Sequence, residues 1–332
     1  MEKRAFGRTG LSLSILGFGC GAVGGLMVRG SHADQDTAIG KALDAGINYF
    51  DTAVQYGDGE SERNLGRIMK ARKPGDAVIG TKVRVPSARA HEIEAVVTES
   101  LDASLQRLQR ERVDIFHLHN PITLTGGNET LSVTQVRDSV LPAFEKLRQA
   151  GKTRFIGITA VGDTAAVRQV IDLGAFNSAQ VSYNMLNPSA AEALPPGYPA
   201  QDYGRLFDHT RQAGVGVVGI RVLAGGALTG TADRHPTASP PPPPIGSAHA
   251  YETDLRRGMR LMPLVTEGYA DSLAEAATRF AIGHPAMGTI LVGMATIAEF
   301  EASLAAVRKG PLPAEALQRL AALRTGFVGE AR

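Results

Sequence analysis

Short, almost continuously apolar runs alternate with longer segments of mixed polarity along most of the chain. A strand that is buried on both faces has no polar side, so such runs are typical of parallel strands covered by helices. We predict eight strands, at residues 13–21, 47–52, 77–83, 113–119, 153–159, 178–184, 214–222 and 288–293.

The segments between these runs carry apolar side chains at the spacing of an amphipathic helix. On the predicted helix 90–110, for example, one face holds Ile93, Val97, Leu101, Leu105 and Leu108. The first predicted helix follows Asp34, a residue type that often caps helices. This first helix is predicted at 35–45, and the remaining helices at 61–72, 136–150, 164–173, 203–213, 273–282, 297–307 and 314–323.

Eight strands that alternate with helices predict an α/β fold, a (β/α)8 TIM barrel. Residues 4–13, with Thr9-Gly10 at the turn, predict an N-terminal β-hairpin. Barrels of this kind commonly run past ~250 residues as one domain. We therefore expect one domain over residues 1–332, with the helix at 314–323 packed outside the barrel.

Residues 230–260 interrupt this alternation and include five consecutive prolines, Pro240 to Pro244. Polyproline stiffens a chain without building a core. The segment lies between the last two predicted strands, where barrel enzymes often carry lids. We interpret it as an irregular surface loop beside the active site; the alternative is a ligand for another domain.

The totals exclude several classes of protein. The 332 residues include 35 basic and 33 acidic ones, a net charge of +2, and no basic tract stands out, so nucleic acid and anionic membranes are not expected partners. The single cysteine, Cys20, excludes an internal disulfide and a cysteine-based zinc site, and we expect no metal. No apolar stretch resembles a signal-peptide core or reaches the ~20 residues of a membrane span. We expect a cytoplasmic protein with a small-molecule substrate, and the sequence leaves its oligomeric state open.

Ionisable side chains end three consecutive predicted strands: Asp51, Lys82 and His119, with Tyr56 in the loop after the first. In a parallel barrel these strand ends meet on the face where chemistry occurs. A neighbouring ammonium favours the phenolate and lowers the pKa of a tyrosine. Each residue alone could have an ordinary structural role, but the set together suits protonation of a carbonyl oxygen while a hydride reaches its carbon. His117, two residues before His119, is interpreted as barrel packing.

The run Gly17-Phe18-Gly19-Cys20-Gly21-Ala22 fits the loose G-x-G-x-x-A pattern of dinucleotide-binding Rossmann folds. That pattern requires a helix to start at once, whereas Val23-Gly24-Gly25 follows here. We interpret these glycines as places where a cofactor or substrate approaches the backbone.

The motifs together resemble the aldo-keto reductase family over nearly the whole chain. The matching segments are Gly46 to Ala53 with Tyr56-Gly57, Glu60 to Glu62 with Leu65-Gly66, Thr81-Lys82, Val113 to Pro121, Gly157 to Thr159, Gln180 to Asn184 and Leu223 to Gly226. The resemblance implies a barrel that binds an extended nicotinamide cofactor. It implies Tyr56 as the general acid or base, Lys82 and Asp51 as its supports, and His119 as the group that orients the carbonyl.

The same resemblance implies residues that hold the cofactor. Thr159 and Gln180 fall where the family holds the nicotinamide carboxamide. The other implied residues are Arg221, Leu223, Gly293, Met294, Thr296 and Glu299. Two positions depart from the family pattern, since Ala160 stands where asparagine is frequent and Ile220 where an aromatic ring often stacks on the nicotinamide.

The resemblance leads to an oxidoreductase that acts on an aldehyde, ketone, alcohol or sugar. The glycine-rich loop and residues 51–66 are similar to the branch that oxidises aldoses to lactones, and a general carbonyl-reducing enzyme is an alternative within the family. Because the family includes channel-associated members, a cofactor-binding regulatory subunit is the alternative. Residues 289–307 contain no lysine or arginine and carry Glu299, which would repel a 2′-phosphate, so NAD is favoured over NADP.

Overall fold

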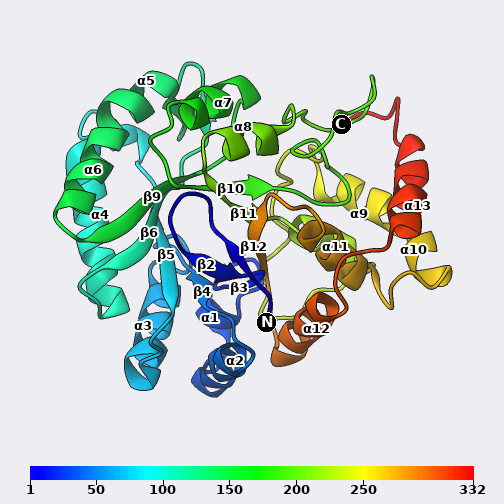
Figure 1. Cartoon of the computed structure of the whole chain (residues 1–332), viewed down its shortest axis with the longest axis horizontal. Helices are drawn as coiled ribbons and strands as arrows, with labels where there is room; N and C mark the ends of the chain where they lie inside the picture. The colour runs from blue at the N-terminus through cyan, green and yellow to red at the C-terminus, as the bar shows by residue number, and fades with distance from the viewer.

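Eight parallel strands close into a barrel in the computed structural model, which describes residues 1–332 (Figure 1). Strand β12 pairs with β3, and this pairing closes the ring. The predicted (β/α)8 barrel is therefore confirmed. In order around the ring the strands are β3 (Leu16–Gly19), β4 (Tyr49–Asp51), β5 (Val78–Val83), β6 (Val113–Leu118), β9 (Thr153–Thr159), β10 (Ser178–Ser182), β11 (Gly216–Ile220) and β12 (Met287–Val292).

The predicted N-terminal hairpin is also present, and it contributes to the inside of the barrel. Strands β1 (Lys3–Ala5) and β2 (Ser12–Ser14) are antiparallel, and between them the ring of Phe6 packs against the start of β11. A Cβ on Gly216 would lie 2.7 Å from that ring, so glycine makes the room. The buried cluster inside the barrel consists of Phe6, Leu13, Tyr49, Val78, Ile115 and Val218.

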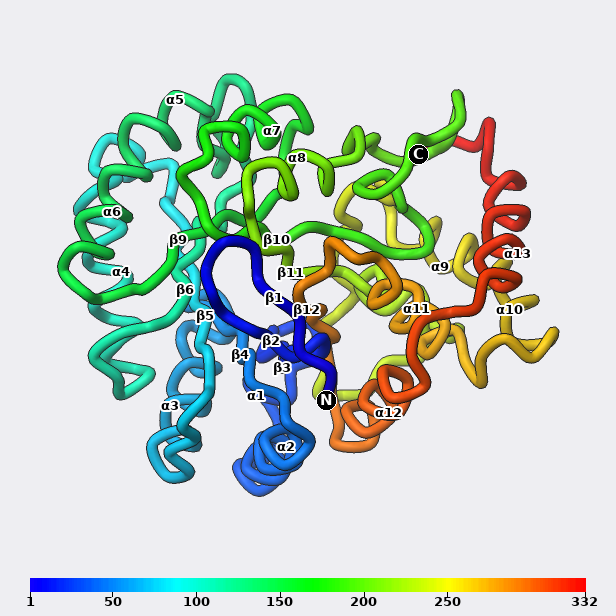
Figure 2. Tube along the Cα trace, viewed as in Figure 1, coloured from blue at the N-terminus to red at the C-terminus, as the bar shows by residue number.

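The helices form an outer ring around the strands (Figure 2). A second, larger cluster of 77 buried residues includes the apolar contacts between strands and helices. Helix α13 (Ala314–Thr325) lies at the rim and contacts α10 (Pro263–Thr266) (Figure 1). The longer helices of the ring are α2 (His32–Asp44), α3 (Glu60–Arg72), α4 (Ile93–Leu108), α6 (Leu141–Gln149), α7 (Thr164–Asp172), α8 (Leu206–Gln212), α11 (Leu273–Ile282) and α12 (Ile297–Arg308).

Several short elements connect the main ones. They are α1 (Leu26–Arg29), η1 (Ser87–Arg89), β7 (Ile122–Thr123), β8 (Leu131–Ser132), α5 (Val133–Gln135), the π-helical turn η2 (Val136–Val140) that leads into α6, and η3 (Ala224–Thr229). Strands β7 and β8 pair with each other outside the barrel. None of the helices combines the length and the apolar character needed to cross a lipid bilayer.

Two local predictions are wrong. Helix α2 begins three residues early, because the Ser31 side chain accepts a hydrogen bond from the Asp34 N–H and is the cap. The segment expected to be irregular over 230–260 ends at residue 250, because Tyr251–Met259 form helix α9 with Tyr251 buried.

Candidate active site

Strands β4, β5 and β6 end side by side at one mouth of the barrel. Asp51 at the end of β4 is in register with Gly80, so it lies beside the part of β5 that carries Lys82. The loop after β4 then turns back through Gly57 and Gly59, whose φ angles of 67° and 83° are easy only for glycine. Tyr56, just before this turn, donates its N–H to the Ala53 carbonyl oxygen at 3.1 Å and so stays close to the strand ends.

The Lys82 ammonium is the centre of the site. Its Nζ lies 2.5 Å from Asp51 Oδ1, 2.8 Å from the Thr52 carbonyl oxygen and 3.1 Å from the Tyr56 hydroxyl. An ammonium has three N–H groups, so all three are used. Burial opposes the charge of Lys82, but the neighbouring Asp51 and Tyr56 outweigh burial, and the pKa of Lys82 lies above its ordinary value.

Burial and the lysine act in opposite directions on Tyr56. Burial raises the pKa of the Tyr56 phenol, while the adjacent Lys82 charge lowers it, and the net pKa is above its usual value. The sequence predicts only the effect of the lysine. The phenol is therefore protonated in this structure and is held beside a cation that would stabilise its phenolate.

His119 lies next to Tyr56. Its ring is edge-on to the tyrosine, with centroids 6.0 Å apart, and its Nδ1 lies 3.1 Å from Gln55 Oε1. Burial, then the charges of Lys82 and Arg84, lower the pKa of His119 to about 3, so the ring is neutral at neutral pH. His117, as predicted, is fully buried in the barrel, with Nε2 2.9 Å from Ser178 Oγ.

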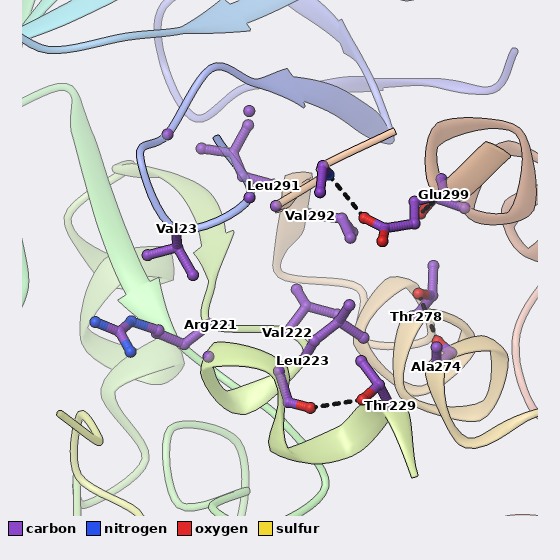
Figure 3. Close-up of a pocket in the computed structure, with 18 of the residues that line it drawn as sticks. Val23, Arg221, Val222, Leu223, Thr229, Ala274, Thr278, Leu291, Val292 and Glu299 are labelled. Atoms are coloured by element: carbon purple, nitrogen blue, oxygen red, sulfur yellow. Dashed lines mark hydrogen bonds between the residues drawn. The ribbon is translucent and has the colours of Figure 1, made fainter. Parts of the chain in front are cut away.

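A cavity of about 790 Å³ opens above these residues. Asp51, Tyr56 and His119 line one end, and the cavity runs to the space between α11 and α12. Figure 3 shows Leu291 and Val292 on one side of the cavity and Val222 and Leu223 on the other. Glu299 lies at the α12 end, and the Arg221 side chain points away from Glu299. A long cavity with ionisable groups at one end suits an extended cofactor that meets a small substrate there.

Comparison with known proteins decides the family. The sequence model of the Aldo/keto reductase family matches residues 15–325. The chain belongs to the aldo/keto reductase family. It is accordingly an NAD(P)-dependent oxidoreductase.

Relatives from several sources share this family. The chain is 30% identical to L-galactose dehydrogenase of Arabidopsis thaliana over 324 residues, which cover 92% of this chain and 88% of the relative. It is 29% identical to pyridoxal 4-dehydrogenase of Microbacterium luteolum, with 88% and 89% of the two chains covered. Its structure is similar to the holo form of aldo-keto reductase AKR11C1 from Bacillus halodurans, with a TM-score of 0.70, 25% identity, and 100% and 98% of the two chains covered.

Most of the predicted cofactor-binding residues line the cavity. They are Thr159, Gln180, Arg221, Leu223, Gly293 and Glu299. Two others do not line it: Met294 is buried with its backbone against Gly24, and the Thr296 side chain caps α12 by accepting from the Glu299 N–H at 3.1 Å. Any contact that Met294 makes to a cofactor would therefore come from its backbone.

The residues at the catalytic end fit the carboxamide of an aldo-keto reductase cofactor. Thr159 Oγ1 is buried and has no hydrogen-bond partner in the protein. Gln180 donates from Nε2 to Asp51 Oδ2 at 2.6 Å, and its Oε1 makes no hydrogen bond to the protein. A hydroxyl and an amide oxygen that both lack partners can serve an amide group.

Sequence reasoning missed two residues near the ends of this cavity. Lys309 lines the far end and bonds Asp271 Oδ2 and Glu275 Oε2, each at 2.7 Å. Lys309 follows the cavity-lining Ala302 by seven residues, or two helical turns, so the two lie on the same face of the helix. This spacing is the signal that could have identified Lys309. Tyr49 lies beneath the other end and donates its hydroxyl to Asp51 Oδ2 at 3.0 Å.

Proposed function

We propose that this aldo-keto reductase transfers hydride between NAD and an aldose or a related aldehyde, with Tyr56 as the general acid or base. One observation carries the proposal: the buried Lys82 ammonium bonds both Asp51 and the Tyr56 hydroxyl at one end of a long cavity. When bound, the nicotinamide cofactor supplies or accepts the hydride.

In carbonyl reduction the Tyr56 hydroxyl would give its proton to the carbonyl oxygen. The phenolate left behind would be stabilised by Lys82, whose own charge is balanced by Asp51. In alcohol oxidation the proton would move the opposite way, from the substrate hydroxyl to the phenolate. His119 would orient the substrate oxygen as a neutral ring, because its pKa of about 3 keeps it uncharged at neutral pH.

Residues along the cavity would hold the cofactor. Thr159 and Gln180 would bind the carboxamide, Arg221 and Leu223 the middle of the cofactor, and Glu299 the adenosine ribose. Gly293, and the backbone of Met294 near Thr296, complete the proposed cofactor set. Ile220 lines the cavity at the position of the usual aromatic ring, so packing on the nicotinamide would be aliphatic.

The substrate class follows from the relatives. The relative named L-galactose dehydrogenase supports an aldose substrate, and the one named pyridoxal 4-dehydrogenase supports a related aldehyde. We further propose that the whole chain, 1–332, works as one domain in the cytoplasm, without a nucleic acid partner.

The test is Tyr56→Phe, which keeps the ring and removes only the hydroxyl. We expect kcat to fall by about 10²–10⁴-fold, the usual contribution of general acid catalysis, while cofactor affinity stays near that of the wild type. Both proteins would be assayed on a panel of aldoses and aldehydes with NAD(H) and NADP(H). Undiminished turnover by Tyr56→Phe, or no turnover by the wild type together with a tight protein partner, would favour the regulatory alternative.

A further inference from the structure

Tyr49 lies inside the barrel, directly beneath the Lys82–Asp51 pair. The side chain is fully buried, and its hydroxyl donates to Asp51 Oδ2 at 3.0 Å. It is not among the residues that line the cavity, so it does not touch a bound substrate or cofactor. Any effect on the reaction must pass through Asp51.

The two neighbouring strands leave space for this ring. A Cβ on Gly17 of β3 would lie 2.9 Å from the Tyr49 ring, and a Cβ on Gly80 of β5 would lie 2.7 Å from its hydroxyl oxygen. Below the ring the cluster is apolar, with Phe6 and Leu13. Phenylalanine would fill the same space, so the hydroxyl is the feature that needs a separate reason.

The hydroxyl completes the hydrogen bonding of the carboxylate. Asp51 Oδ1 faces Lys82, while Oδ2 accepts from Tyr49 and, at 2.6 Å, from Gln180 Nε2. Burial, followed by the Asp51 charge, raises the pKa of Tyr49 well above its ordinary value, so the group remains a donor over the working pH range. Fixed donors to a buried carboxylate hold its orientation and disperse its charge.

We propose that Tyr49 is a positioning residue for the reaction: its hydroxyl holds Asp51 Oδ2 and keeps Oδ1 on Lys82. Because this hydrogen bond disperses the carboxylate charge, Asp51 offsets less of the Lys82 charge, and the ammonium stabilises the Tyr56 phenolate more strongly. The inference rests on the proposed role of Tyr56. The titratable or charged groups that face the Tyr56 hydroxyl are Cys20, Asp51, Lys82, His119 and Arg221.

The experiment compares Tyr49→Phe with Tyr198→Phe. Tyr198 also donates its hydroxyl within the protein, to the Leu186 carbonyl oxygen at 2.9 Å, but it does not line the cavity. For Tyr49→Phe we expect the pH at half-maximal kcat in alcohol oxidation to rise by about 0.5–1 unit, and kcat at neutral pH to fall about three- to tenfold. The KM values and cofactor affinity should change less than about twofold, because uniform binding is untouched. Tyr198→Phe should keep the wild-type profile.

A loss of folded protein that is the same at every pH lowers kcat without moving the midpoint. The folded fraction of each variant, measured over the same pH range, separates any pH-dependent loss of stability from the expected shift. A wild-type midpoint in Tyr49→Phe, or equal shifts in Tyr49→Phe and Tyr198→Phe, would overturn the role of Tyr49. The role of Tyr56 is judged separately: normal turnover by Tyr56→Phe overturns the proposed function, whatever Tyr49→Phe does.

Discussion

Replacing Lys82 with methionine removes the ammonium at the centre of the site but keeps an unbranched apolar side chain. The Tyr56 hydroxyl, 3.1 Å from Nζ, loses the cation that favours its phenolate. Unit charges about 4 Å apart interact by about 4 kcal/mol at an effective dielectric constant near 20. The Asp51 carboxylate offsets part of the Lys82 charge, so we take about half of this interaction energy, ~2 kcal/mol, which corresponds to about 1.5 pKa units.

The direction of the effect follows from which form of Tyr56 reacts. Alcohol oxidation needs the phenolate, and Lys82→Met raises the pKa of the phenol, so less phenolate is present at any pH below that pKa. We expect the midpoint of the kcat profile for oxidation to move up by about 1.5 units, and kcat at neutral pH to fall about 30-fold or more.

The same substitution strands the Asp51 carboxylate in a buried position. Breaking a buried ion pair by removing one partner typically costs about 3–5 kcal/mol of folding free energy. The double variant Asp51→Asn/Lys82→Met removes the stranded charge, so it should regain much of this stability without regaining turnover. Lys152→Met, which removes a partly exposed partner of Asp102, should leave both properties nearly unchanged.

The assay is kcat against pH with saturating cofactor, together with the midpoint of chemical unfolding for each variant. An unshifted pH profile in Lys82→Met would refute the reasoning. So would recovery of turnover in the double variant, since it would show that the stranded charge, and not the lost ammonium, caused the defect.

Two further predictions concern the rest of the cavity. The wild type should prefer NAD over NADP, and Glu299→Arg should shift kcat/KM toward NADP because it replaces a repelling charge near the proposed adenosine ribose with an attractive one; an NADP preference in the wild type, or no shift in the variant, would contradict this. Limited proteolysis should cut residues 236–250 in the free protein and less with cofactor bound, and the cuts should fall before residue 246, because Pro240 to Pro244 supply no N–H groups whereas residues 246–248 are buried and bonded to Asn187 and Arg257. Complete protection without cofactor would argue against a mobile loop.

The barrel could be predicted because strands that are buried on both faces appear in the sequence as short, almost continuously apolar runs. Strand β9, predicted at 153–159, runs from Thr153 to Thr159 in the structure. The pairing of β7 with β8 could not be predicted, since each strand has two residues and shows no period. Ser31 and Asp34 are both good capping residues, and the apolar pattern does not choose between them.

Helix α9 was missed for a different reason. Its buried face includes Asp254 and Arg257, so the hydrophobic period is absent where the helix meets the protein. Arg257 donates to the carbonyl oxygens of Pro199 and Ala331, contacts that depend on distant chain segments. A helix held by buried polar groups has no signature in a hydrophobic pattern.

The candidate site divides in the same way. Asp51, Lys82 and His119 could be predicted to meet because each lies at a strand end, where position in the sequence fixes position in the barrel. Tyr49 and Asp51 are two residues apart on one strand, so their side chains lie on the same face and can bond. This bond was not predicted, because a tyrosine within an apolar run is interpreted as packing. The residues at the far end of the cavity come together through the packing of α11 against α12, and no local sequence pattern predicts this packing.

The charges at that far end bear on the choice between NAD and NADP. Residues 289–307 contain no lysine or arginine, yet Lys309 lines the cavity. Its ammonium is shared by Asp271 and Glu275, each 2.7 Å away, and Glu299 adds a third carboxylate that accepts the Ala295 N–H at 2.7 Å. Arg279 also bonds Glu275, at 3.0 Å, so three carboxylates face two cations and leave this end negative. A 2′-phosphate would meet repulsion there even beside a lysine, because that lysine already has two partners, whereas a ribose hydroxyl could donate to Glu299.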